Sequence, residues 1–311
     1  MESVGSPLLW AGFVGFVLAM LALDLGVFHR QAHAVTLREA ALWSLVWIAL
    51  SLAFNGLVVH WFGVEKGLEF LTGYLIEKAL AVDNIFVFYA IFAYFAVPSA
   101  LQHRVLFWGV LGALVLRAVF ILLGAALLEK FHWVMYVFGA ILLFTAFKLV
   151  AMSEEGFHPE RNPVYRWFRR LVPCVSQYHG GRFTILEAGK RHATPLLLVL
   201  VLIEWTDLVF AVDSIPAIFA VTSDPFLVFT SNIFAILGLR SLFFLLSGVI
   251  GKFHLLKLAL AAVLAFVGAK MLLLDVVEVP IVLSLGVIAG LIAAGVVGSL
   301  LFPRKLALNE T

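Results

Sequence analysis

Apolar runs of about twenty residues recur along most of this 311-residue chain. Only α-helices and closed barrels satisfy all their backbone hydrogen bonds in lipid, and a helix needs about 20 apolar residues to cross it. Charged residues make up 13% of the chain and hydrophobic residues 63%, whereas a soluble domain carries about 25% charged residues. The sequence therefore predicts an all-α, polytopic membrane protein.

Windows of high hydropathy divide the chain into nine expected membrane-spanning helices. Their ranges are 7–28, 38–61, 68–97, 101–128, 131–151, 193–221, 225–250, 253–274 and 279–302. No basic segment precedes the first helix, so we interpret it as a retained helix rather than a cleaved signal peptide.

Basic residues are concentrated in the links that would lie on one side of the membrane. That side carries Arg30, Arg38, Arg104, Arg161, Arg166, Arg169, Arg170, Arg182, Lys190, Arg191, Lys252, Lys257, Arg304 and Lys305. The other side carries only Lys66 and Lys130. Because cytoplasmic loops are enriched in Lys and Arg, we expect the N-terminus outside and the C-terminus in the cytoplasm.

The long polar insert, residues 152–192, falls on the expected cytoplasmic side. Within it, residues 163–173 mix basic and aromatic side chains, a composition that favours a short helix at an anionic lipid surface. Residues 182–190 indicate a small hairpin. Charge beside the membrane accounts for these basic residues, so we expect no nucleic-acid binding.

Two of the expected spans contain the same acidic pattern. Residues 77–85 read Glu-Lys-Ala-Leu-Ala-Val-Asp-Asn-Ile, residues 207–215 read Asp-Leu-Val-Phe-Ala-Val-Asp-Ser-Ile, and Glu204 lies just ahead of the second pattern. Each carboxylate at bilayer depth costs about 2.5–3.5 kcal/mol, or on the order of 12–18 kcal/mol for all five acids. We therefore expect a cation to offset their charge.

Other polar residues recur in the same order after each acidic pattern. Arg117 in the fourth expected helix matches Arg240 in the seventh, and Lys148 in the fifth matches Lys270 in the eighth. Because each copy has three helices, an odd number, the copies should run in opposite directions, as in the inverted repeats of secondary transporters. The predicted units are 1–67 with two helices, 68–151 as the first repeat, 152–192 as the basic insert, 193–278 as the second repeat, and 279–311 as the last helix and tail.

Ideal helical geometry does not bring the acids of one pattern together. Glu77 and Asp83 are six residues apart, which is about 9 Å of rise and roughly 240° of rotation. We therefore expect broken backbone within or just after each pattern. Pro216 favours such a break in the second copy, because it cannot donate to the carbonyl of Val212; Phe86 takes its place in the first copy.

The side chains available inside these spans are hard oxygen donors. Histidines fall near the span ends, and the chain has one cysteine. Oxygen-only sites suit Mn²⁺, Mg²⁺ or Ca²⁺ better than Cu⁺ or Zn²⁺. The candidate metal ligands are Glu77, Asp83, Glu204, Asp207 and Asp213, with Asn84, Ser214, Asp24 and Asn232 as secondary ligands or members of an ion path. Asn232 also suits packing between helices, and Asp24 could reach the membrane interface instead.

Two other roles compete with a metal site. The acids could pair internally with Lys78, Arg117 or Arg240, although pairing alone does not explain three acids within residues 204–213. They could also carry protons, because carboxylates held close together favour sharing a proton. The metal and proton roles can coexist as exchange, since a metal binds deprotonated acids and protonation expels it. No nucleotide-binding loop is present, so uphill transport would need an ion gradient.

The acidic patterns resemble the signature motifs of the TerC family. Residues 77–87 and 204–221 are similar to two of its motifs, and residues 230–240 to a third. The resemblance covers nearly the whole chain and is nearest to the Alx branch of bacterial inner-membrane proteins. It implies a manganese exporter whose expression is tied to alkaline pH and manganese, with the five acids above as its transport residues.

From the residues and the resemblance together, we expect a transporter rather than an enzyme. It would export Mn²⁺ from the cytoplasm in exchange for protons, with no organic cofactor. Its expected partners are the lipid bilayer, the divalent ion and protons, and the residues identify no protein partner. Two rival functions stay open: an accessory protein that hands metal to exported proteins, and a proton-conducting protein of pH homeostasis.

Overall fold

The computed structural model describes residues 3–28, 36–151, 160, 162–187, 189–247 and 253–302, and the side chains of residues 24–28 are not among those described. These residues form eleven helices and one antiparallel hairpin. The helices are α1 (Pro7–Phe28), α2 (Leu37–Phe62), α3 (Val64–Tyr94), α4 (Ser99–Lys130), α5 (Val134–Ala151), α6 (Pro163–Leu171), α7 (Pro195–Phe219), α8 (Pro225–Leu237), α9 (Leu239–Leu246), α10 (Leu256–Leu272) and α11 (Ile281–Leu301). The strands are β1 (Thr184–Glu187) and β2 (Lys190–Ala193).

Helices occur in all nine expected spans, and the prediction of an all-α membrane protein is confirmed. Five of the described helices, α2, α4, α5, α7 and α11, are long and apolar enough to cross a membrane. The expected span 225–250 contains two helices, α8 and α9, which meet at Gly238 with a bend of 40° and together could form a sixth crossing. The total of nine crossings stays a prediction.

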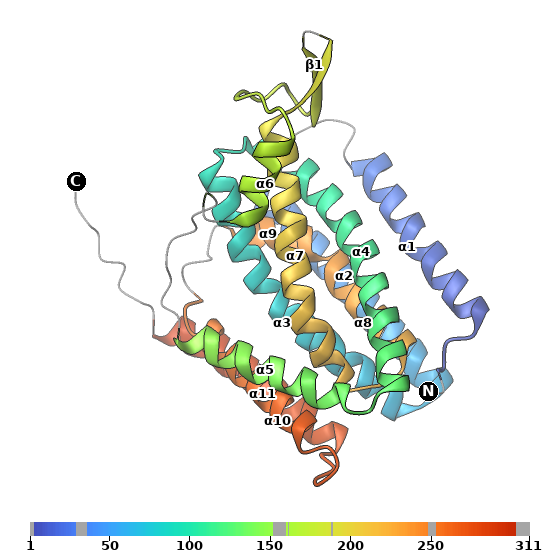
Figure 1. The fold of residues 1–311 in the computed structure, drawn as a ribbon. Coiled ribbons are helices and arrows are strands. Elements are labelled where there is room, and N and C mark those ends of the chain that lie inside the picture. Colours follow the sequence, from blue (N-terminus) through green and yellow to red (C-terminus); the bar gives the residue numbers. More distant parts are fainter. Residues whose placement is uncertain are drawn as a thin grey trace.

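The helix packing agrees with the predicted inverted repeat. In that repeat α3 is the counterpart of α7, α4 of α8 with α9, and α5 of α10. Figure 1 shows α3 running in the opposite direction to α7, and α4 in the opposite direction to α8. The helix contacts show the same correspondence. The contact between α3 and α8 is the counterpart of the contact between α7 and α4, and the counterparts α5 and α10 pack against each other.

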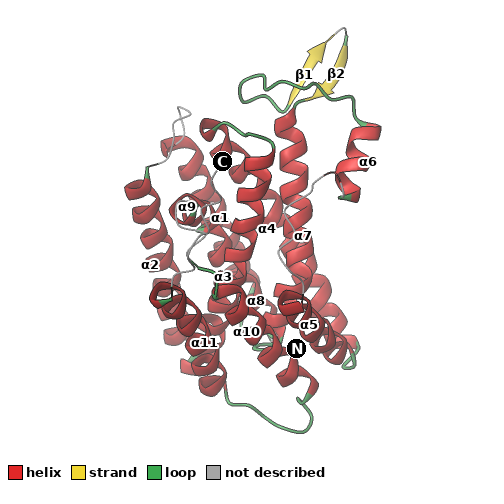
Figure 2. Ribbon diagram, turned by 90° about the vertical axis from the view of Figure 1, so that its left-hand side faces the viewer, coloured by secondary structure: helices red, strands yellow, loops and turns green. Residues whose placement is uncertain are grey.

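A second layer, formed by α5, α10 and α11, crosses beneath the lower half of α3 and α7 (Figures 1 and 2). α5 and α10 approach with their backbones nearly in contact. A Cβ atom added to Gly268 would lie 2.9 Å from the carbonyl oxygen of Gly139, and one added to Gly139 would lie 3.0 Å from that of Gly268. Glycine is therefore required on both helices for this layer to close.

This contact predicts a loss of stability in the Gly268→Ala variant. The carbonyl that the new methyl group meets belongs to the backbone and cannot rotate away, so we expect the free energy of unfolding to fall by about 1–3 kcal/mol. Gly286→Ala on α11 is the matched control, because open space surrounds that position and alanine favours a helix. Thermal melting in detergent measures both, and equal melting temperatures would contradict the packing described.

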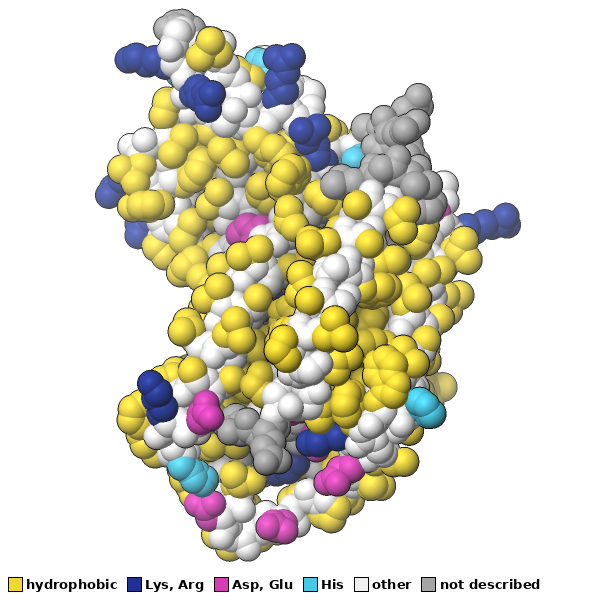
Figure 3. All heavy atoms as spheres, turned by 90° about the vertical axis from the view of Figure 1, so that its right-hand side faces the viewer, with side chains coloured by type: hydrophobic (Ala, Val, Ile, Leu, Met, Phe, Trp, Pro, Cys, Tyr) yellow, Lys and Arg dark blue, Asp and Glu magenta, His cyan; other side chains and the backbone are white. Residues whose placement is uncertain are grey.

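The basic insert contains the short helix and the hairpin that the sequence predicts. α6 buries Phe168 against α7, while Trp167 stays exposed. The hairpin turns at Gly189, where φ is +76°, and it pairs Glu187 with Lys190. In Figure 3 Lys and Arg side chains gather at the end of the molecule that carries the hairpin, while most of the acidic side chains in this view lie at the opposite end, with some Lys or Arg side chains among them.

The expectation of broken backbone at the acidic patterns is wrong. α3 runs unbroken from Val64 to Tyr94, and α7 continues through Pro216 to Phe219. A buried membrane helix tolerates proline because its neighbours hold it in place, and Pro216 is packed among buried side chains. The described break lies elsewhere, at Gly238 between α8 and α9.

Candidate metal site in the membrane core

An ion triad joins the two acidic patterns in the centre of the helix bundle. α3 and α7 pack side by side, and α4 supplies Arg117 between them. The guanidinium bonds Glu77 of α3 through Nη1, and it bonds Asp207 of α7 through Nη2 at 3.0 Å and Nε at 3.4 Å. At most 2% of any of the three residues is exposed. The predicted pairing of these acids with Arg117 is confirmed.

Three neutral polar side chains complete the hydrogen bonding of this triad. Asn232 of α8 donates to Glu77 Oε2 at 2.9 Å, and Asn84 donates to Asp207 Oδ1 at 3.3 Å. Arg117 Nη1 also donates to the hydroxyl of Ser214 at 3.2 Å. Four helices therefore contribute to one hydrogen-bond network. Asn232 connects α8 with α3, which agrees with the role in helix packing that its sequence context suggested. Buried charges are tolerated when they are paired and hydrogen-bonded in this way.

A small cavity of about 40 Å³ lies beside the triad. Residues of both acidic patterns line it: Glu77, Asp83 and Asn84 from α3, and Asp213 and Ser214 from α7, together with Arg117, Leu80, Thr145, Leu149, Phe210 and Leu264. Asp83 and Asp213 are half-buried, and Thr145 of α5 donates to Asp213 Oδ1 at 2.8 Å. The cavity has room for an ion or one or two water molecules.

Asn84 places a hard ligand in the wall of this cavity. Its side chain is 1% exposed, and its Oδ1 has no hydrogen-bond partner among the residues that the structure describes. Buried amide oxygens are almost always hydrogen-bonded, so an unpartnered one needs an explanation. An amide oxygen beside carboxylates is the type of ligand that a hard divalent cation prefers.

Glu204 does not join this site. It lies one helical turn from Asp207 but packs against Gly112 of α4, where an added Cβ would overlap its carboxylate. Its Oε2 is buried without a hydrogen-bond partner in the described part of the chain, and the residue does not line the cavity. The i,i+3 spacing predicted a helical face shared with Asp207, and both side chains do face α4, Asp207 at Arg117 and Glu204 at Gly112.

Two further predicted residues, Lys78 and Arg240, do not line the cavity. Lys78 donates to the carbonyl of Ala235 at 3.3 Å, and Arg240 lines a separate small cavity with Asp207. The side chain of Asp24 lies outside the described residues. Within the described ranges, no three His, Cys, Asp or Glu side chains lie close enough together to hold a metal ion.

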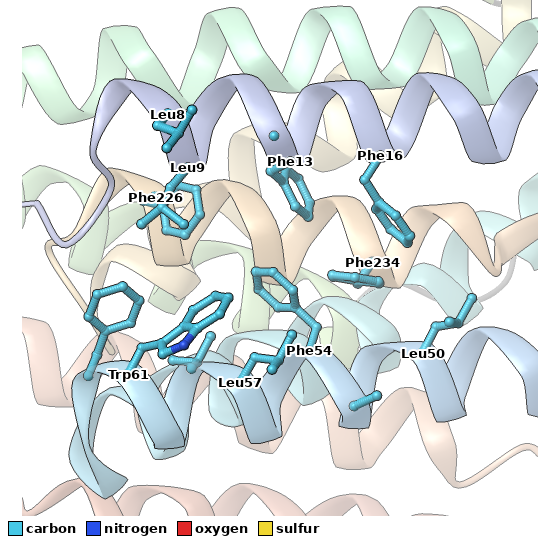
Figure 4. Close-up of a pocket in the computed structure, with 14 residues that line it drawn as sticks. Leu8, Leu9, Phe13, Phe16, Leu50, Phe54, Leu57, Trp61, Phe226 and Phe234 are labelled. Carbon is cyan, nitrogen blue, oxygen red and sulfur yellow. The ribbon is translucent and has the colours of Figure 1, made fainter.

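A larger cavity lies between α1, α2 and α8 and has a volume of about 370 Å³. Figure 4 shows Phe13, Phe54 and Phe234 directed into it from these three helices. All fourteen lining residues are apolar, so it offers no ligand for an ion. The small cavity between the repeats, which carboxylate side chains line, is therefore the better candidate for an ion site.

Comparisons with known proteins agree with the sequence motifs. The family described as "Integral membrane protein TerC family" matches residues 62–306. The chain belongs to the TerC family. A membrane protein of Myxococcus xanthus is 56% identical over 308 residues, covering 99% of this chain and 97% of its own length. No solved structure matches the chain.

The family relatives include the Alx branch that the motifs indicate. Alx of Escherichia coli (strain K12), whose name carries the proposal of a membrane-bound redox modulator, is 50% identical over 302 residues and 94% of each chain. A membrane protein of Rickettsia bellii is 39% identical over 292 residues, or 94% of this chain and 97% of its own. The chain is thus a TerC family membrane protein related to Alx.

Thr145 and Gly112 contact two of the predicted acids, and the sequence did not reveal either contact. Thr145 contacts Asp213, and Gly112 leaves the space that Glu204 fills. A lone threonine and a lone glycine in apolar helices carry no signal of either role. Only the packing of α5 and α4 against α7 brings them to the acids.

Proposed function

We propose that this TerC family protein is a secondary transporter that exports Mn²⁺ from the cytoplasm in exchange for protons. The observation that carries the proposal is the cavity that Glu77, Asp83 and Asn84 share with Asp213 and Ser214. Acids from two oppositely directed repeats line this one cavity, and inverted-repeat carriers hold their substrates at such an interface between repeats. The name of the relative Alx describes a redox modulator. This chain has a single cysteine and therefore cannot form a disulfide within itself, so its cysteine chemistry does not support that role.

The ligand chemistry supports a hard divalent cation. The cavity offers carboxylate oxygens from Asp83, Asp213 and Glu77, the unpartnered Oδ1 of Asn84 and the hydroxyl of Ser214. Such oxygen sets suit Mn²⁺, Mg²⁺ and Ca²⁺. Asp83 and Asp213 face the cavity from opposite repeats, and they would rotate toward each other to hold the ion. Protons act as the counter-ion because protonated carboxylates release a metal.

Flux of Mn²⁺ into vesicles that contain the purified protein tests this proposal. We expect Mn²⁺ to enter protein-containing vesicles faster than empty ones, and the lumenal pH to rise as protons leave. Proton movement that is insensitive to Mn²⁺ would favour the proton-conducting alternative. Absence of both movements would favour the accessory protein that hands metal to exported proteins.

The proposed location is the bacterial inner membrane, with the N-terminus outside and the C-terminus and basic insert in the cytoplasm. Cys174 in the insert, the one cysteine of the chain, can report this orientation. Burial raises the pKa of its thiol, and the Arg169 guanidinium offsets part of that rise. Its thiolate fraction at neutral pH is therefore lower than that of a free cysteine.

Labelling of Cys174 with a membrane-impermeant maleimide measures the orientation. We expect labelling in inside-out vesicles and none in intact spheroplasts. The rate should still be rising at about pH 8.5, the ordinary pKa of a free cysteine, because the thiolate is the reactive form and burial raises the pKa of this thiol. Cys174→Ser is the control for background labelling. Labelling in intact spheroplasts would contradict the proposed orientation and place the insert outside the cell.

A further inference from the structure

We infer that Arg117 is a tethered cation that competes with the transported ion for Glu77, so that ion binding displaces one end of the guanidinium and ion release restores it. This inference rests on the proposed function and adds a regulatory element to the same site. Arg117 belongs to α4, whereas the acidic patterns lie in α3 and α7.

The contacts of Arg117 divide into a fixed end and a competing end. Nε and Nη2 hold Asp207, which is not among the residues that line the cavity. Nη1 bonds Glu77 and Ser214, which both line it, and makes a longer bond to Asn232 Oδ1 at 3.4 Å, which does not line it. The guanidinium is therefore anchored outside the cavity, while its other end occupies two groups that an ion in the cavity would need.

The charges of the site favour such an exchange. One guanidinium serves two fully buried carboxylates, and two more, Asp83 and Asp213, face the same cavity. A divalent cation in the cavity offers Glu77 a partner of higher charge, while Arg117 keeps Asp207. When the ion leaves, Nη1 returns to Glu77, so the buried carboxylate is never unpaired. An ion site that must also release its cargo requires this kind of limit on affinity.

The competing explanation is that Arg117 only lowers the negative potential of the core. Lys78 provides the matched control for that explanation. It follows Glu77 in sequence and also lies within the bundle, but its ammonium bonds the Ala235 carbonyl and packs beside Gly238. Lys78→Gln removes the same unit charge near the acids without removing a guanidinium contact to Glu77.

Arg117→Lys is the deciding variant. It keeps the positive charge that the buried acids need, but an ammonium lacks the planar fork that bridges two carboxylates. We expect its apparent affinity for Mn²⁺ to increase on the order of tenfold, the equivalent of one lost charge-assisted hydrogen bond, and its maximal flux to fall. Lys78→Gln should change the affinity much less. If Arg117 acted only through its charge, Lys78→Gln would change the affinity for Mn²⁺ more than Arg117→Lys does.

A double-mutant cycle with Glu77→Gln isolates the competition. In the Glu77→Gln background Arg117 no longer pairs with a carboxylate that the ion would bind. Arg117→Lys should therefore no longer raise the affinity for Mn²⁺. Mn²⁺ binding to protein in lipid nanodiscs gives the four affinities, and thermal melting shows that each variant is folded. Arg117→Gln leaves two buried carboxylates without a cation and is expected to fold poorly, which is why the lysine variant is used.

The outcomes separate this inference from the proposed function. Wild-type protein that neither binds nor carries Mn²⁺ would overturn the transport proposal itself. Wild-type flux combined with an unchanged affinity in folded Arg117→Lys would overturn the competition alone. An equal effect of Arg117→Lys with and without Glu77→Gln would also overturn it, because the effect of the arginine on the ion would then not depend on Glu77.

Discussion

Asp83→Asn and Asp213→Asn are each expected to reduce Mn²⁺ flux by about a hundredfold or more, since metal sites lose 10–100-fold even when a supporting group around the ligands is removed. Each variant removes one carboxylate that faces the cavity and leaves an amide of nearly the same shape. Both residues are half-buried, so the fold should survive either change. Flux into vesicles at matched protein content measures the effect.

Two acids outside the cavity serve as controls for this prediction. Asp275→Asn changes a carboxylate at the surface that contacts His132 and Tyr136, and it should leave flux unchanged. Glu204→Gln changes a membrane acid that packs against Gly112, and it should retain far more flux than Asp83→Asn. Loss of flux in Glu204→Gln to the level of Asp83→Asn would return Glu204 to the ligand set that the sequence predicted.

Arg117→Ala is expected to lower the free energy of unfolding by about 3–5 kcal/mol, the usual cost of removing one partner from a buried ion pair. The cost arises because Glu77 and Asp207, which are at most 2% exposed, would lose the cation that compensates their buried charges. Replacing all three groups by Arg117→Met with Glu77→Gln and Asp207→Asn should restore most of the stability, since no charge then remains unpaired.

Unfolding of these variants in mixed detergent micelles measures the difference. Lys78→Ala is a suitable comparison, because its ammonium bonds a carbonyl rather than a carboxylate and its loss should cost less. If Arg117→Ala unfolds at the wild-type denaturant concentration, the two carboxylates are not held as charged groups by this arginine.

The helices and the acidic patterns could be predicted from sequence because they depend on local composition. Long apolar runs have no alternative to helix in lipid. The recurrence of Arg117 as Arg240 and of Lys148 as Lys270 also indicated the pairing of counterpart helices that the packing shows. Asn232 could be assigned to two roles, and the structure places it between α8 and α3.

The details of the site could not be predicted, because they depend on contacts between helices. Reasoning within one helix required a broken backbone to bring the acids together, whereas α3 and α7 stay continuous and meet side by side. The same reasoning placed Glu204 and Asp207 among the ligands, but Glu204 packs against Gly112 of α4, Asp207 bonds Arg117 of α4, and neither acid lines the cavity. Pro216 suggested a break in α7, but the bend occurs at Gly238, a residue free of side-chain constraints.

The most direct test of the account is the electron paramagnetic resonance spectrum of Mn²⁺ bound to the purified protein in lipid nanodiscs. The account predicts one oxygen-coordinated Mn²⁺ per chain, lost in Asp83→Asn and equally in Asp213→Asn, because each repeat supplies one side of the same cavity. Binding that survives in either variant at wild-type affinity, or no binding by the wild-type protein, would contradict a shared site between the two repeats.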